Sequence, residues 1–564
     1  MQRVVPGLFF LVSGCVAPPP TESPLPDKSA SLEASWEIGE EVPCSAGQDA
    51  FLVLEEQGEQ HGVDRPIPES SSSVTPGHYL VGVLVADLEA DEDLDLAFNR
   101  PDGGIDLYLN DGSGNFTHSD ALATEGMSWG PSDLSRGFAD INGDGLPELF
   151  QTSFDGLSMR PALAPLEWGP RQSVWDATGT PYEGAGWLSF SVGDLDGDGP
   201  LDLVLASLHG AFDHSAGQGG PPAEAELIFF GDGTGGFSEP VRLVSHEGPG
   251  MSQLILLTDR DADGDLDIFV GSDLVGPQWP PGTLFENGGL GQDGTLQLAD
   301  VGEESGGAVA MSHMGADASD LNGDGLLDYC FTDIGPVVCL ESDPSGVFVD
   351  TRAVHGLVPA SMDIPEHWTG WSMEIADLDN DGLEDFVAAA GRVDDFVDQD
   401  NPGDLRPWES DQPNGIWQAT ARGVWEERTD LLDFGSIRES YGLATADLDG
   451  DGALEVIIGN ELGLPSVWWN QCSDGAWLQI DIQGRAHNVD ALGAAVVIED
   501  GEERWTQEVY SLRTLGQGPT RLHFGLGDRE TVERVTVRWP GGATSVRTDL
   551  PTRRFLRVRH PEAF

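Results

Sequence analysis

The stretch DLDGDGALE, from Asp447 to Glu455, decides the fold of this chain because six variants of it occur earlier in the sequence. All seven copies read D-x-[DNE]-x-D-[GE]-x-x-[DE], and successive copies start 53 to 70 residues apart. Self-similarity at such a period indicates a repeat architecture. One acidic turn of this kind would be a weak signal, whereas seven copies in the same local context are a strong one.

Oxygen-bearing side chains at the alternate positions 1, 3 and 5 predict a calcium loop in every copy. Calcium takes about six to eight oxygen ligands, and a tight loop directs alternate side chains at one point. Glycine at position 6 supplies the positive φ that the turn needs. Position 7 has no common side chain, so its ligand must be the backbone carbonyl, which even Pro200 retains. Position 9 is again Asp or Glu in every copy.

The expected ligands, for up to seven Ca²⁺ ions, occupy positions 1, 3, 5, 7 and 9 of each copy. From the first copy to the seventh they are Asp87, Glu89, Asp91, Asp93 and Asp95; Asp140, Asn142, Asp144, Leu146 and Glu148; Asp194, Asp196, Asp198, Pro200 and Asp202; Asp259, Asp261, Asp263, Asp265 and Asp267; Asp320, Asn322, Asp324, Leu326 and Asp328; Asp377, Asp379, Asp381, Leu383 and Asp385; and Asp447, Asp449, Asp451, Ala453 and Glu455.

The first copy departs most from the shared pattern. It has Glu92 where the other six copies have glycine, and Glu89 at position 3 is longer than Asp or Asn. A residue other than glycine at positive φ is strained by about 1 kcal/mol. We therefore expect the first loop to be the weakest site.

Short apolar runs flank the acidic copies and predict buried strands. SYGLATA precedes Asp447 and VIIG follows Glu455, and a third strand comes after a glycine-rich turn in most units, as in IDLYLNDGSGNFT from Ile105. Three or four short strands per unit predict a propeller blade. An EF-hand is excluded because position 12 is never Glu and no amphipathic helix flanks the loops. A β-sandwich with unrelated acidic turns is disfavoured, since every copy lies at the same strand–loop–strand boundary.

The repeat resembles the FG-GAP or VCBS repeat, from near Tyr79 to Asn470. Beyond it, WLQIDIQG from Trp477, NVDALGAAVVI from Asn488, LHFGLGD from Leu522 and VTVRWPGG from Val535 resemble the domain called ASPIC and UnbV. This domain order is similar to that of bacterial relatives of cartilage acidic protein. The resemblance implies an all-β chain, with an integrin-α-like, seven-bladed calcium-binding β-propeller over residues 50–470 and a small, sandwich-like β domain over residues 471–564.

The N-terminus predicts export and a lipid anchor. Arg3 precedes an apolar stretch from Val4 to Val12, and the following residues up to Cys15 resemble a bacterial lipobox. Residues 1–14 would be the signal peptide, Cys15 the lipidation site, and residues 15–49 a Pro/Ser-rich tether. The alternative is an ordinary secretory signal with an incidental cysteine. No apolar run reaches about 18 residues, so we expect a protein anchored at the bacterial cell envelope, at the outer membrane or cell surface.

Four further cysteines, Cys44, Cys330, Cys339 and Cys472, favour disulfides in an exported protein, although three pairings or four free thiols are open from the count alone. Cys330 and Cys339 flank a turn. The seventh unit lacks an outer strand, and AFLVLEEQGEQHGV from Ala50 has the character of one. If residues 51–54 pair antiparallel to residues 467–470, Cys44 lies close to Cys472. We therefore predict a Cys44–Cys472 disulfide that closes the ring.

Composition restricts the possible partners. The formal net charge of −71 predicts repulsion from nucleic acid and from anionic membrane surfaces, so contact with a membrane is expected only through a lipid anchor. No G-x-S-x-G, H-E-x-x-H or P-loop motif is present. We expect a non-enzymatic surface scaffold for recognition or adhesion, with an extracellular protein or glycan as partner.

The alternative functions are a polysaccharide-acting enzyme or a lectin on the same calcium-stabilised propeller. The acidic insertion from Arg392 to Pro413 is the candidate enzyme loop, although a solvated loop explains it as well. Histidines expected near the channel mouth, and tryptophans that could form a binding rim, are more simply explained as solvated or packed side chains. These residues are His78, His313, His367, Trp187, Trp368 and Trp371.

Overall fold

The computed structural model describes residues 31–44, 52–66, 81–100, 104–122, 133–153, 156–178, 187–207, 226–243, 252–273, 281–351, 357–359, 368–391, 412–429, 432, 434–435, 438–461, 463–510 and 515–563. These residues form thirty-nine strands and one short helix, α1 (Gly302–Ser305), so the expected all-β class is confirmed. Within them, no helix is long and apolar enough to cross a membrane.

Seven sheets of the described chain each carry one acidic loop between their first and second strands. In chain order of these loops, the sheets contain β3 (Val83–Ala86), β4 (Asp95–Asn99), β5 (Ile105–Asn110) and β6 (Phe116–Ser119); β7 (Asp133–Ala139), β8 (Glu148–Ser153), β9 (Gly156–Arg160) and β12 (Gln172–Asp176); β13 (Trp187–Gly193), β14 (Asp202–Ser207), β15 (Glu226–Phe229) and β16 (Val241–Leu243); β17 (Ser252–Thr258), β18 (Asp267–Ser272), β19 (Thr283–Leu290) and β20 (Leu296–Asp300); β21 (Ala316–Ser319), β22 (Asp328–Asp333), β23 (Gly335–Ser342) and β24 (Phe348–Asp350); β25 (Gly370–Ala376), β26 (Asp385–Ala390), β27 (Gly415–Ala421) and β28 (Val424–Glu427); and β29 (Ser440–Ala446), β30 (Glu455–Asn460), β31 (Ser466–Asn470) and β2 (Leu54–Glu56). A hairpin of β10 (Ala162–Ala164) and β11 (Glu167–Trp168) is inserted between β9 and β12.

The first strands of neighbouring sheets pack against one another and form a ring. Strand β3 contacts β7, β7 contacts β13, β13 contacts β17, β21 contacts β25, β25 contacts β29, and β29 contacts β3. The sheets of β17 and β21 share one apolar cluster that contains Leu256 and Ala318. The arrangement is that of a propeller, in which every sheet packs face to face with the next one.

Burial on both faces explains why the second strands read as continuous apolar runs. Every residue of β18, β26 and β30 is buried. The apolar clusters lie between sheets: Val83 of the first sheet, for example, packs in one cluster with Ala444 and Trp469 of the seventh. The core of the propeller is therefore a set of sheet–sheet interfaces around the ring.

The outer strand of the seventh sheet comes from the N-terminal segment. Strand β2 pairs antiparallel with β31, with Leu54 opposite Asn470. The expected match of residues 51–54 to residues 467–470 would have placed Leu54 opposite Val467, so the register is shifted by three residues. Cys44 and Cys472 form a disulfide beside this closure. A second disulfide joins Cys330 and Cys339, which are cross-strand partners on β22 and β23.

The C-terminal domain consists of two four-stranded sheets around one core. One sheet has the order β1 (Ser35–Ile38), β39 (Arg554–Arg559), β32 (Ala476–Gln483) and β36 (Leu522–Gly527). The other has the order β34 (Glu503–Glu508), β33 (Ala495–Asp500), β37 (Thr531–Arg538) and β38 (Thr544–Pro551). Leu478, Val496, Val537 and Leu556 are among the fully buried residues of the shared core.

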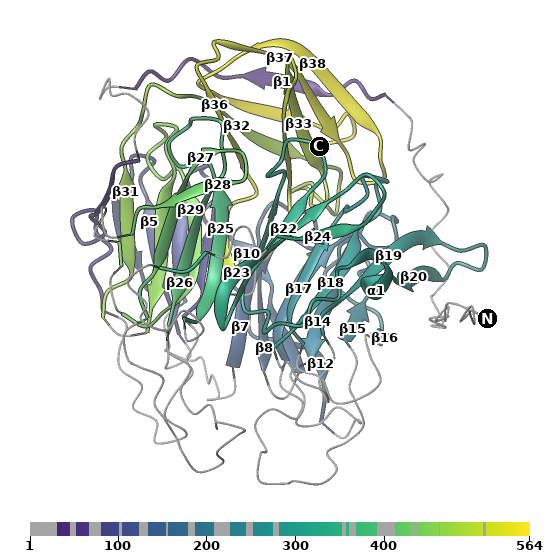
Figure 1. The fold of residues 1–564 in the computed structure, drawn as a ribbon. Coiled ribbons are helices and arrows are strands. Elements are labelled where there is room, and N and C mark those ends of the chain that lie inside the picture. Colours follow the sequence, from purple (N-terminus) through teal and green to yellow (C-terminus); the bar gives the residue numbers. More distant parts are fainter. Residues whose placement is uncertain are drawn as a thin grey trace, which may run out of the picture.

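The expectation of a tether through residue 49 is wrong for residues 31–44. Strand β1 pairs antiparallel with β39 and is an edge strand of the C-terminal domain (Figure 1). Trp36 packs against the core of that domain, and burial of its ring outweighs the polar composition that predicted a tether. Residues 15–30 and 45–49, including the predicted lipidation site Cys15, lie outside the described residues.

A short segment of the C-terminal domain, β35 (Gly516–Gln517), reaches the first strands of the propeller. It pairs parallel with β3, and the Gln517 side chain accepts a hydrogen bond from Phe138 N at 2.9 Å and donates one to Phe138 O at 2.8 Å. A Cβ on Gly516 would lie 2.1 Å from the Leu443 carbonyl oxygen, so only glycine fits there. Because β3, β7 and β29 all contact it, the segment lies at the axis of the ring.

Removal of the Cys44–Cys472 disulfide should destabilise the protein by about 2 to 5 kcal/mol, because this bond closes a span of 428 residues. The expected result for Cys44→Ala with Cys472→Ala is a lower urea midpoint in calcium. Each single variant, kept reduced, should cost as much as the double variant, since either one breaks the same bond. Unfolding curves that match the parent protein would contradict the prediction.

Candidate metal centres at the seven acidic loops

Each acidic loop winds around the carboxylate at its first position. In the second loop, Asp140 Oδ1 accepts hydrogen bonds from Gly143 N at 2.8 Å and Asp144 N at 3.2 Å, while Oδ2 accepts one from Gly145 N at 2.6 Å. In the fifth loop, the backbone N–H groups at the same three loop positions donate to Asp320. The first residue therefore shapes the loop, whether or not an ion is bound.

Two positions in every loop adopt a positive φ. At position 6, φ is 84° to 104° for the six glycines and 77° for Glu92, as the sequence pattern required. Position 4 is also positive, with Ala90, Ala262 and Asn380 near 60° and glycine in the other loops. This second requirement was not predicted from the sequence, although Gly, Ala or Asn occupies position 4 in every copy.

The carboxylate at position 9 ties the loop to the sheet. Asp385 accepts hydrogen bonds from Leu378 N at 3.1 Å and from Ala419 N, on the third strand, at 2.7 Å. Asp95 does the same with Leu88 N and Asn110 N, both at 2.9 Å. One side chain thus connects the loop, the second strand and the third strand.

Carboxylates converge closely enough in four loops to hold a metal ion. In each of these loops three side chains offer oxygens that all lie within 4.8 Å of one another. The groups are Asp194, Asp196 and Asp202; Asp259, Asp261 and Asp263; Asp377, Asp379 and Asp385; and Asp447, Asp449 and Glu455. The second and fifth loops have Asn at position 3, which leaves them one carboxylate fewer. The first loop has carboxylates at positions 1, 3, 5 and 9, and no such group is found among its described residues.

Burial and like charges raise the pKa values of these acids. Burial, followed by the charges of Asp320 and Asp324, raises the pKa of Asp328 to about 8. Burial also raises the pKa of Asp95 to about 7 and that of Asp202 well above its ordinary value. Buried carboxylates that repel one another need a cation or a proton.

The residues of the third loop fit a calcium ion. Asp194 is 8% exposed, and its Oδ1 has no hydrogen-bond partner among the described residues. An oxygen left without a partner beside two further carboxylates is suited to a hard divalent cation, which takes carboxylate and carbonyl oxygens. The oxygen-only donor set favours calcium or magnesium over metals that prefer nitrogen or sulfur.

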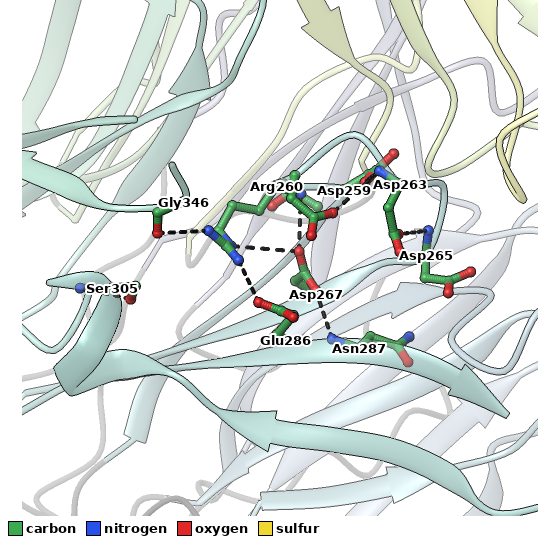
Figure 2. A network of polar contacts seen from close by, with 12 residues as sticks. Asp259, Arg260, Asp263, Asp265, Asp267, Glu286, Asn287, Ser305 and Gly346 are labelled. Atoms are coloured by element: carbon green, nitrogen blue, oxygen red, sulfur yellow. Dashed lines mark hydrogen bonds and ion pairs between the residues drawn. The ribbon is translucent and has the colours of Figure 1, made fainter. Parts of the chain in front are cut away.

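The fourth loop has an additional cation built into it (Figure 2). Arg260 occupies position 2, where the other loops have Leu or Ile, and its guanidinium lies 3.9 Å from Asp267. It also pairs with Glu286 at 2.9 Å and donates to the Gly346 carbonyl at 3.2 Å. Arg260 therefore offsets part of the loop's negative charge and links it to the turn before β24.

The C-terminal domain covers the face of the propeller on which the loops lie (Figure 1). Hydrogen bonds or ion pairs reach five of the loops: Arg557 to Glu92 at 2.9 Å, Gly541 to Gly264 at 2.9 Å, Arg504 to Asp324 at 3.0 Å, Trp505 to Gly382 at 3.0 Å, and Gln479 to Asp447 at 2.9 Å. At a sixth, the second loop, a Cβ on Gly143 would lie 2.6 Å from His487 N. Sequence reasoning missed these residues because no local pattern marks them.

Two tryptophans considered for a binding rim are core residues. Trp368 and Trp371 are buried, and their Nε1 atoms donate to the Pro413 and Gly391 carbonyls, each at 2.9 Å. His313 is also fully buried and contacts the Ser272 carbonyl. The side chain of Trp187, the residues His78 and His367, and the insertion over residues 392–411 lie outside the described residues.

The first loop should bind calcium most weakly. Glu92 holds a positive φ without being glycine, and its carboxylate pairs with Arg557 instead of facing the loop. Calcium binding can be followed by hydrogen exchange and mass spectrometry during a calcium titration. Peptides over residues 87–95 should need a higher calcium concentration for protection than the peptides of the other six loops. Glu92→Gly should lower the calcium concentration that protects the first loop, toward the concentrations that protect the other loops. Protection of the first loop before the third would contradict this ranking.

The stability of the calcium-free protein should fall as pH rises. Asp95 and Asp328 have pKa values near 7 and 8 in the folded state and about 4 when unfolded. A raised folded-state pKa stabilises below the unfolded value, and that stabilisation is lost as pH rises through the folded value. Calcium-stripped protein should therefore melt at a lower temperature at pH 8.5 than at pH 5. Saturating calcium should abolish or reverse this trend, and a flat profile in stripped protein would refute it.

Comparisons with known proteins agree with this architecture. A family model described as FG-GAP-like repeat matches residues 87–150 and 320–388, and one described as ASPIC and UnbV matches residues 484–563. "Cartilage acidic protein 1" of Mus musculus is 26% identical over 346 residues, which are 51% of this chain and 51% of that protein. The chain thus spans about half the length of this curated relative.

Several solved structures are similar at low identity. A lectin from Agrocybe aegerita that recognises non-reducing terminal N-acetylglucosamine is 16% identical, with 68% of this chain and 86% of that one covered and a TM-score of 0.41. BBS1N in complex with ARL6DN is 10% identical, with coverages of 75% and 97% and a TM-score of 0.39. Saccharomyces cerevisiae Sqt1 is 9% identical, with coverages of 86% and 99% and a TM-score of 0.40.

The sequence motifs, the strand–loop–strand units and the family matches agree. The chain contains FG-GAP-like repeats followed by a C-terminal ASPIC and UnbV domain, with weak similarity to cartilage acidic protein 1.

Proposed function

We propose that this chain is an exported, calcium-binding lipoprotein whose propeller is a rigid scaffold for recognition of an extracellular protein or a glycan. FG-GAP repeats with an ASPIC and UnbV domain suggest a surface recognition scaffold. The disulfides Cys44–Cys472 and Cys330–Cys339 are compatible with export, since such bonds persist in oxidising compartments. The lipid anchor at Cys15 rests on the sequence pattern alone.

The convergence of three carboxylates in each of four loops carries this proposal. Each loop joins the first and second strands of its sheet. Its ninth residue also accepts a hydrogen bond from the third strand, as Asp95 does in the first loop and Asp385 in the sixth. An ion in the loop would therefore hold three strands together. Calcium would then make the scaffold rigid, and residues outside the loops would bind the partner.

The recognition surface should lie away from the acidic loops. The C-terminal domain contacts six of the seven loops directly, through hydrogen bonds, ion pairs or close packing at Gly143. A large partner cannot reach loops that another domain already covers. We therefore assign recognition to the sides of the propeller or to its opposite face.

Calcium removal should lower the melting temperature by tens of degrees. A ligand that binds only the folded state contributes RT ln(1 + [L]/Kd), about 2.7 kcal/mol per site at 100-fold excess over Kd, and several sites sum. Melting of a soluble chain that begins at residue 31 should be compared in calcium and in EGTA at pH 8. Magnesium at the same concentration is the control for ionic strength. An unchanged melting temperature would sink the calcium proposal.

The partner can be sought with the same soluble chain. It should be screened against immobilised glycans and against surface proteins, with and without calcium, and binding should require calcium because the scaffold does. Each glycan should be recovered and its length measured. Shortened polysaccharide would overturn the scaffold proposal in favour of an enzyme.

A further inference from the structure

Gln479 of the C-terminal domain touches the first carboxylate of the seventh loop. It lies on β32, the first strand after Cys472, and is 1% exposed. Its Nε2 donates a hydrogen bond to Asp447 Oδ2 at 2.9 Å. A neutral amide from another domain therefore lies beside the side chain that begins a candidate metal centre.

The Asp447 carboxylate already has its hydrogen bonds from within the loop. Its Oδ1 accepts from Gly450 N at 2.7 Å and from Asp451 N at 3.2 Å, and its Oδ2 accepts from Gly452 N at 2.9 Å. Asp449 and Glu455 offer oxygens within 4.8 Å of an Asp447 oxygen. The loop thus lacks no donor, and its surplus of negative oxygens calls for a cation.

The other end of the Gln479 amide has no partner. Gln479 Oε1 is buried and accepts no hydrogen bond among the described residues. A buried acceptor without a donor is unfavourable, because it has lost its hydrogen bonds to water. The oxygen and nitrogen of an amide have nearly the same shape, and their assignment follows from the hydrogen-bond network, which changes when an ion is present.

Exchange of the two amide atoms satisfies both ends once a cation is bound. Oε1 would then face the seventh loop as a neutral ligand, of the kind calcium accepts alongside carboxylates. Gln479 also lines a cavity of about 80 Å³ between the two domains. That lining includes the carboxylates Asp317 and Glu374, which can accept from an N–H group, as well as the donor side chain of Arg521.

We propose that Gln479 Oε1 is a ligand of the cation in the seventh loop, so that ion binding fastens the C-terminal domain to the propeller. This inference rests on the proposed calcium function. Gln479 would be a ligand from outside the repeat. Its bond to the ion would explain why the C-terminal domain covers the loop face. The rival arrangement keeps Nε2 as a donor to Asp447 and places water in the cavity against Oε1.

Two substitutions distinguish a ligand from a donor. Gln479→Leu removes both roles, whereas Gln479→Glu removes the donor and supplies a stronger oxygen ligand. The full soluble chain should be titrated with calcium and followed by hydrogen exchange, with peptides over residues 447–455 reporting the seventh loop and peptides over 194–202 serving as an internal control. Gln483→Leu, on the same strand and bonded to Arg559, is the matched control variant.

We expect Gln479→Leu to raise the calcium concentration that protects the seventh loop by about tenfold or more, with the third loop unchanged. Gln479→Glu should lower the calcium concentration that protects the seventh loop below the value for the parent protein. If the Glu variant weakens calcium protection as the Leu variant does, or if neither changes it, the ligand role is overturned while the calcium function stands. If calcium protects none of the loops in the parent protein, the calcium function and the Gln479 ligand role both fall.

Discussion

The structure depends on one buried carboxylate that starts the second strand of every sheet. This side chain, for example Asp95, Asp328 or Asp385, is at most 1% exposed and accepts backbone N–H groups from its own loop and from the third strand. A carboxylate in such a place is costly unless its charge is balanced. The loop places further carboxylates beside it, which increases the cost. The fold therefore concentrates negative charge where only a cation or a proton can neutralise it, and it does so once in every sheet.

The placement of the C-terminal domain follows from the same constraint. A propeller that leaves its acidic loops bare would present a strongly negative face to solvent. Here the C-terminal domain brings Arg504, Arg557, Gln479 and the indole of Trp505 to that face, and all four donate hydrogen bonds to loop oxygens. Its segment at Gly516 and Gln517 reaches the axis of the ring. The domain is thus held both by its contacts with the loops and by its segment at the axis of the ring.

The two chain ends are interlocked by this arrangement. The N-terminal segment first adds β1 to the C-terminal domain, then supplies β2 to the seventh sheet, and the Cys44–Cys472 bond lies between these pairings. The ring and the domain that covers it consequently share the same closing segment. Loss of either pairing would expose an unpaired strand edge, which invites association with other chains. The disulfide within this closure is compatible with an exported protein.

Local spacing in the sequence was enough to determine the seven loops, the strands beside them and the positive φ at the sixth position, because each depends on residues within one repeat. The pairing of β2 with β31 could be anticipated because the seventh unit lacked an outer strand. Only the tertiary structure decided that residues 35–38 form a strand of the C-terminal domain, that Gln517 binds Phe138 across 379 positions, and that Gln479 meets Asp447. These contacts join surfaces that are complementary in three dimensions, and no periodicity in the chain encodes them.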